Sequence, residues 1–135
     1  MAERSISEIL QHARTIAVVG LSNNPSKPSY EVAAYLQSAG YRIIPVHPAV
    51  REVLGETAYR TLAEIPEKVD IVDVFRRSEA VPEIADAAIA IGAGVLWLQE
   101  GVEHEEAAAQ ARAAGLTVVM NRCLLKAHAA WQAEK

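Results

Sequence analysis

The sequence predicts an α/β fold, and two observations predict it. Short apolar runs rich in β-branched residues alternate with amphipathic segments along the whole chain, which is typical of a parallel sheet covered by helices on both faces. The first apolar run also ends at Gly20 and leads into a polar loop and a helical segment, as in nucleotide-binding folds. The expected architecture is therefore Rossmann-like, a three-layer α/β/α domain on a mainly five-stranded parallel sheet with strand order 3-2-1-4-5.

Each expected strand is a short apolar run, because strands buried on both faces rarely alternate with polar residues. The strands are expected over 15–19, 41–46, 70–75, 95–98 and 117–120. The stretch 47–66 has no clear period and is expected to be irregular, with a short strand near Ala58 and a helical turn near Leu62.

The helices are expected from apolar spacing and from residues that favour helix ends. Ser29 is expected to be the N-cap of the second helix and Gly40 its C-terminal stop. Pro82 fits the first turn of the third helix, and the acids at the start of the fourth complement the helix macrodipole. The helices are expected over 5–12, 29–40, 79–92, 103–115 and 124–131.

Length and composition narrow the class of protein. A chain of 135 residues with 51% apolar and 22% charged residues is expected to form one domain, residues 1–135. A formal charge of −4 argues against a nucleic-acid partner. The longest uncharged run, 87–99, is shorter than the ~20 residues that cross a bilayer, so no membrane association is expected. A single cysteine suggests a reducing, cytoplasmic location.

The loop after the first strand carries the chemistry of a phosphate site. In such folds ligands bind beyond the carboxyl ends of the strands. Gly20 allows a sharp turn, Ser22, Asn23 and Ser26 offer polar groups, and Lys27 adds a positive charge before a helix N-terminus. The alternative is an ordinary polar connection between a strand and a helix.

The same loop argues against a dinucleotide. It has Ser22 where a dinucleotide loop has its second glycine, and His47 follows the second strand where an acid would bind a ribose hydroxyl. A ligand with more phosphate fits better, because cations gather at the expected ligand edge. They are Lys27, Arg51, Arg76, Arg77 and Arg122. For any one of them, the alternative is a cation that only solvates a loop.

Four segments together carry a family resemblance. The stretches "IAVVGLSNNPSKPSYEVAAYLQSAGYRIIPVHP", "VDIVDVFRR", "VLWLQEGV" and "VVMNRC" resemble, by their order and spacing, the small single-domain CoA-binding proteins. These share their fold with the CoA-binding domain of the succinyl-CoA synthetase α-subunit. The resemblance runs over 16–123. The chain departs from the family pattern at Asn121, where an acid is usual, at Ala127 before His128, and at His47, where asparagine is common.

The resemblance implies coenzyme A as the cofactor and a role for each part of the ligand edge. Gly20, Ser22 and the helix after Lys27 would hold the diphosphate, and Lys27 or Arg76 would pair with the 3′-phosphate. Val46, His47, Pro48 and Phe75 would surround the adenine, and Asn121 and Arg122 would lie near the pantetheine arm. The full expected set is Gly20, Ser22, Asn23, Ser26, Lys27, Ser29, Val46, His47, Pro48, Phe75, Arg76, Asn121 and Arg122. For Phe75 the alternative is plain core, and for His47 an exposed loop.

The expected function is binding of coenzyme A or an acyl-CoA, without evident catalytic machinery. No metal site is expected, because the four histidines are far apart in sequence. Two alternatives stay open, an NAD(P)-binding enzyme and a CoA-binding component that acts with an acyl-CoA synthetase partner; self-association also stays open. Cys123 follows Arg122 at an expected helix start. Two interpretations of this cysteine stay open: it forms a mixed disulfide with the CoA thiol, or it is a small buried apolar residue.

Overall fold

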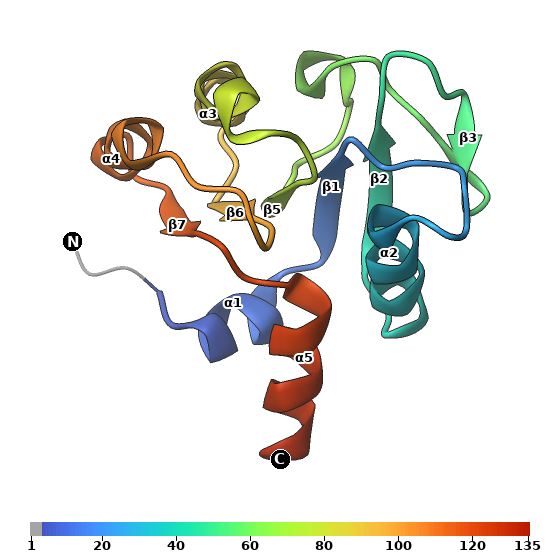
Figure 1. Ribbon diagram of the computed structural model, residues 1–135. Coiled ribbons are helices and arrows are strands. Elements are labelled where there is room, and N and C mark those ends of the chain that lie inside the picture. Colours follow the sequence, from blue (N-terminus) through green and yellow to red (C-terminus); the bar gives the residue numbers. More distant parts are fainter. Residues whose placement is uncertain (1–3) are drawn as a thin grey trace.

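A five-stranded parallel sheet forms the centre of the molecule (Figure 1). The computed structural model describes residues 4–135. The sheet strands are β1 (Thr15–Val19), β2 (Arg42–Val46), β5 (Ile71–Val74), β6 (Val95–Leu98) and β7 (Thr117–Val119). The structure therefore confirms the expected α/β class and parallel sheet, and each strand lies within one residue of its expected bounds.

Helices cover both faces of the sheet and form two apolar layers (Figure 1). The helices α1 (Ile6–His12), α2 (Pro28–Ser38) and α5 (Leu124–Ala133) cover one face, and α3 (Val81–Ala90) and α4 (Glu105–Ala113) cover the other. Neighbouring strand residues point to opposite faces. In β1, Ile16 and Val18 therefore pack in what we call the α2/α5 layer, whereas Ala17 and Val19 pack in the α3/α4 layer.

The strand order corrects the sequence-based expectation. The order is β2-β1-β5-β6-β7, so the third long strand lies between the first and the fourth and not beyond the second. The outer edge of β2 is unsuited to a full neighbour, because Pro45 has no N–H to donate. That edge carries a single parallel bridge between Val46 and Tyr59, with the Tyr59 N–H donating to the Pro45 carbonyl at 3.0 Å.

The irregular segment between β2 and β5 forms a small hairpin and a turn. Strands β3 (Glu52–Val53) and β4 (Glu56–Thr57) pair antiparallel, and the 3₁₀ helix η1 (Leu62–Glu64) follows. The short strand lies one residue before the expected Ala58, and the expected turn at Leu62 is confirmed. A second 3₁₀ helix, η2 (Ser78–Ala80), leads into α3.

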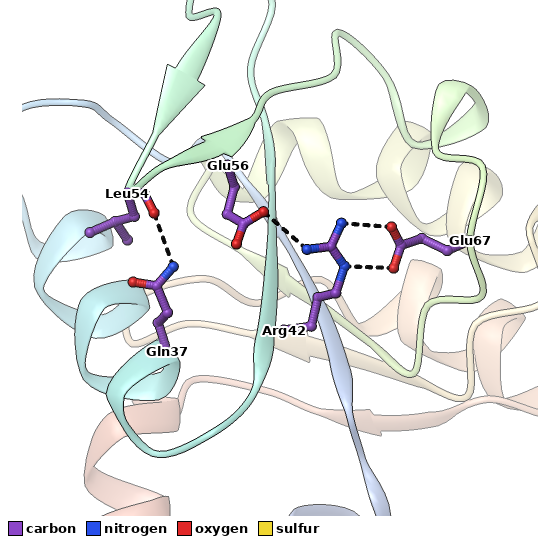
Figure 2. A network of polar contacts seen from close by, with 5 residues as sticks. All are labelled: Gln37, Arg42, Leu54, Glu56 and Glu67. Carbon is purple, nitrogen blue, oxygen red and sulfur yellow. Dashed lines mark hydrogen bonds and ion pairs between the residues drawn. The ribbon is translucent and has the colours of Figure 1, made fainter.

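A polar network holds this hairpin beside the sheet (Figure 2). The Arg42 guanidinium binds both oxygens of Glu67 at 2.7 Å and the Glu56 carboxylate at 3.0 Å. The Gln37 amide of α2 donates to the Leu54 carbonyl at 3.0 Å. Because Arg42 starts β2, the network lies at the amino end of that strand. It anchors the tip of the hairpin, whose base lies at the carboxyl end of β2, where Tyr59 bridges to Val46.

Helix ends match the expectation in part. Ser5 caps α1 through a reciprocal capping box with Glu8, and Gly40 has a positive φ of 105° just past α2. Ser29 is not an N-cap, because Pro28 starts the helix earlier and Lys27 occupies the cap position. Ser29 is instead buried inside the first turn. Among residues 4–135, no helix combines the length and apolar character needed to cross a bilayer.

Candidate functional site

A cavity of about 640 Å³ opens at the carboxyl edge of the sheet, beside the N-terminus of α2. Six of the expected residues line it together: Gly20, Ser22, Lys27, Ser29, His47 and Phe75. Four further lining residues were not expected individually: Pro28, Gln99, Glu100 and Val102. Three of these follow β6, and the rule that ligands bind beyond strand ends could have identified them.

Gly20 is required where β1 leaves the sheet. Its φ is +87°, a left-handed conformation that residues with a side chain rarely adopt. A Cβ atom at this position would overlap the Phe75 carbonyl oxygen and lie 3.0 Å from the Arg76 Cδ. The Gly20 N–H donates to the Val46 carbonyl at 2.8 Å. The glycine therefore lets three strand ends meet at the floor of the cavity.

The loop after Gly20 is held by its own side chains. The Ser22 Oγ accepts from the Asn24 N–H at 3.0 Å. The Asn24 Oδ1 accepts from the N–H of Ser26 at 3.0 Å and from its hydroxyl at 2.8 Å. The Ser22 N–H donates to the buried Ser29 Oγ at 3.0 Å. Sequence reasoning missed Asn24, although an asparagine two residues before a serine is typical of such turns.

Helices α2 and α5 begin at this edge without a side-chain cap, as does α3. Among residues 4–135, neither α2, after Lys27, nor α5, after Cys123, has a cap hydrogen bond from the residue that precedes it. By contrast, the His104 Nδ1 accepts from the Ala107 N–H and caps α4 at the same edge. An anion at the start of α2 would therefore bind the Ser29 N–H, because Pro28 has no N–H and the Tyr30 N–H donates to the Lys27 carbonyl at 3.1 Å.

Five of the seven remaining expected residues divide between two smaller cavities. Val46, Pro48 and Arg76 line a cavity of about 280 Å³ on the α3 side, together with Arg60. The expected adenine wall is therefore split, because His47 and Phe75 face the larger cavity instead. Asn23 and Ser26 lie exposed in the loop and line neither of these cavities.

Asn121 and Arg122 line a third cavity, of about 260 Å³, with Cys123 and Lys126. Asn121 has a positive φ of 55°, a conformation that asparagine tolerates. Its Oδ1 accepts from the Gly101 N–H at 2.7 Å and so fixes the loop after β6. The Arg122 carbonyl accepts from the Trp97 indole at 2.8 Å. Glu100 lines both this cavity and the cavity of about 640 Å³.

Two buried polar side chains at this edge have acceptor atoms without a hydrogen-bond partner. They are Asp73, fully buried in β5, and Gln99, 8% exposed after β6. Within the described residues, both Asp73 carboxyl oxygens and the Gln99 Oε1 are unpaired. Burial raises the pKa of Asp73 to about 8, so its carboxyl is mainly neutral at pH 7. The signal for this group in the sequence is the acid Asp73 inside the apolar run 70–75.

His128, which follows the family departure at Ala127, lines none of these three cavities. It is buried on α5 near the amino ends of the strands, where its Nδ1 is 2.8 Å from the Tyr35 hydroxyl. It also lines a separate cavity of about 540 Å³ around Tyr41 and Trp131. No group of three metal-ligating side chains comes together in the part of the chain that the structure describes.

Comparison with known proteins places the chain among CoA-related domains. The family described as "CoA binding domain" matches residues 14–129. A Bacillus subtilis (strain 168) protein, "Uncharacterized protein YneT", is 45% identical over 128 residues, 95% of both chains. A structure titled "hypothetical protein from Pyrococcus horikoshii OT3" is 35% identical with a TM-score of 0.92, and the match covers 98% of this chain and 99% of that one.

A more distant similarity connects the chain to large enzymes. The α-subunit of a Pyrococcus furiosus acetate–CoA ligase (ADP-forming) is 44% identical over 59 residues. This match spans 43% of the present chain and 13% of the subunit. The chain is thus similar to one region of that enzyme subunit.

Proposed function

The chain belongs to the family of CoA binding domains, and on this premise we propose that it binds coenzyme A at the carboxyl edge of its sheet. The observation that carries the proposal is the family match over residues 14–129, which includes every loop that lines the 640 Å³ cavity. The polar loop, the uncapped helices and the cavity support the same conclusion. Free CoA and acyl-CoA both have the head group that this edge suits.

The cavities suit the parts of coenzyme A in turn. The N-terminus of α2 and the Lys27 ammonium would bind the diphosphate, because a helix start favours anions. The apolar cavity with Val46 and Pro48 would take the adenine, with Arg60 and Arg76 beside it for the 3′-phosphate. The pantetheine arm would then run across the larger cavity toward Gln99.

Calorimetry with a set of related ligands tests this proposal. We expect coenzyme A to bind more tightly than ADP, which lacks both the 3′-phosphate and the arm, and more tightly than NADPH. Native mass spectrometry of the purified protein should also show a bound species of the mass of CoA or an acyl-CoA. Tighter binding of NADPH than of coenzyme A would instead favour the dinucleotide alternative.

A second candidate is a CoA-binding component that serves an acyl-CoA enzyme. The similarity to part of the acetate–CoA ligase α-subunit favours it. A tagged chain that captures an acyl-CoA synthetase from the extract of its own cells, in a CoA-dependent manner, would support this role. Capture of the tagged chain alone, under conditions where it binds coenzyme A, would contradict it.

A further inference from the structure

The carboxyl edge has an inner row of residues behind the row that lines the cavity. Gly20, Phe75 and Gln99 line the cavity at the ends of β1, β5 and β6. Two residues earlier on each strand lie Val18, Asp73 and Trp97, which pair directly with one another across the sheet. Because side chains repeat every two residues on one face, the inner row lies roughly 6.5 Å deeper on that face.

Asp73 points into the α2/α5 layer with the cavity row. Its strand neighbours Val72 and Val74 pack in the opposite layer, whereas Ile71 and Phe75 pack in the α2/α5 layer. The carboxyl therefore lies on the cavity side of the sheet, behind Phe75. The Trp97 indole N–H, beside it in the inner row, donates to the Arg122 carbonyl and leaves the Asp73 carboxyl unpaired.

An unpaired buried polar group is costly and needs a physical reason. Leaving one buried acceptor unsatisfied destabilises a protein by about 1–3 kcal/mol. The Asp73 carboxyl and the Gln99 carbonyl are both in this condition, on adjacent strands at one end of the sheet. Such groups are often explained by a partner that binds there. The neutral Asp73 carboxyl has an O–H to donate, and the Gln99 Oε1 accepts, so the partner must supply both an acceptor and a donor.

We propose that Asp73 and Gln99 form the inner end of the ligand site and bind the amide groups of an uncharged arm, with the protonated Asp73 carboxyl donating its O–H to an amide carbonyl and the Gln99 Oε1 accepting from an amide N–H. This inference rests on the proposed function and specifies which part of the ligand goes deepest. The pantetheine arm of coenzyme A carries two amides, each with one N–H donor and one carbonyl acceptor. Access to Asp73 requires Phe75 or Gln99 to turn, because both lie in the row in front of it.

Variants of Asp73 separate this role from a purely structural one. Asp73→Leu removes the orphan acceptors and should raise the thermal midpoint. It should also weaken the binding of coenzyme A by at least about tenfold, which corresponds to one lost buried hydrogen bond. Adenosine 3′,5′-bisphosphate, which lacks the arm, should bind both proteins equally. Gln99→Leu should show the same selective loss for coenzyme A.

Asp73→Asn is the second variant, because it keeps the shape and stays neutral at every pH. It should bind coenzyme A at pH 7 within about twofold of the natural protein. Above pH 8 the natural protein should lose affinity for coenzyme A as Asp73 ionises, and Asp73→Asn should lose less. The other titratable groups packed in this layer are the same in both proteins: Tyr30, Tyr35, Tyr41, Cys123 and His128.

Val72→Ala is the matched control, since Val72 is equally buried in the same strand but packs in the opposite layer. It should lower the thermal midpoint and leave the ratio of the two ligand affinities unchanged. The inference is overturned if the natural protein binds coenzyme A and Asp73→Leu binds it equally well. A natural protein that does not bind coenzyme A at all overturns the proposed function as well.

Discussion

At the scale of single residues, both the fold and the candidate site depend on the absence of a Cβ atom at Gly20. The structure leaves no room there for a side chain, and the backbone is left-handed. Gly20→Ala should therefore destabilise the protein by about 2 kcal/mol or more, as measured by urea denaturation.

Gly115 provides the control for this substitution. Its φ is +99°, but apart from its chain neighbours no atom of residues 4–135 lies within 4 Å of the position that a Cβ would take. Gly115→Ala should cost only the conformational part, about 1 kcal/mol. Equal losses from the two substitutions would show that the close approach of Phe75 has no energetic effect.

Lys27 carries the positive charge of the phosphate loop. It is exposed at the N-cap of α2 and lines the cavity of about 640 Å³. We expect Lys27→Ala to weaken the binding of coenzyme A by about 1–3 kcal/mol, typical of a lost charged hydrogen bond. Lys68→Ala is the control, because Lys68 is equally exposed but precedes β5, at the opposite edge of the sheet. If both variants bind coenzyme A as the natural protein does, Lys27 does not contact the phosphates.

The sequence predicted which residues lie at the ligand edge, but it did not predict the hydrogen-bond partners of their side chains. The rule for strand ends identified the loop with Gly20, Ser22 and Lys27. It did not show that the Asn24 side chain binds Ser26, or that Asn121 binds the loop after β6. These contacts depend on loop conformations that follow only from the folded backbone.

At the scale of elements, the packing of α5 on α2 contains a pH-sensitive contact. Burial, and to a lesser extent the Lys135 charge, lowers the pKa of His128 below its ordinary value of 6.5. The folded protein thus resists protonation of a group that the unfolded chain protonates readily. Stability from this contact should be full above pH 6.5 and fall as the pH decreases below it, with a slope of up to ~1.4 kcal/mol per pH unit.

His128→Gln tests this expectation, because glutamine keeps a hydrogen-bonding group near the Tyr35 hydroxyl and cannot titrate. Urea midpoints of the two proteins should be compared at pH 7.5 and pH 5. The variant should lose less stability than the natural protein on acidification. Parallel losses in the two proteins would mean that His128 does not contribute to the pH dependence.

Most elements were predictable because strand and helix periods differ clearly along this chain. The bounds of β1 and β6 agree with the expected ones. The predicted start of α2 was wrong, because proline is favoured at the first helical position and Pro28 occupies it, one residue before the expected Ser29. The strand order was also wrong, although Pro45 gave a signal: a proline within a strand favours an edge position, and β2 is an edge strand.

At the scale of the whole molecule, Asp73 should set part of the dependence of stability on pH. Its pKa is about 8 in the folded protein against an ordinary value of 3.8. Between these values the folded state holds a proton that the unfolded state releases. The contribution of Asp73 to stability therefore falls as the pH rises through this window, by up to ~1.4 kcal/mol per pH unit.

Asp73→Asn removes this titration. The free energy of unfolding of the variant, measured by urea denaturation, should therefore increase relative to that of the natural protein from pH 4 to pH 8. Asp70→Asn is the contrasting variant in the same segment. The Asp70 carboxylate accepts from the Arg14 and Thr15 N–H groups at 2.9 and 3.0 Å, so its replacement should destabilise the protein. An unchanged pH dependence in Asp73→Asn would contradict the neutral state of Asp73.

Pro45 has one more consequence for the molecule. A second copy that approached along the outer margin of β2 would meet a strand with no donor at Pro45, and the charged Arg42 occupies its start. Both features oppose the growth of a sheet from one copy to the next. The outer edge of β2, which has no full-length neighbouring strand, should thus also protect concentrated solutions of the protein from fibrillar aggregation.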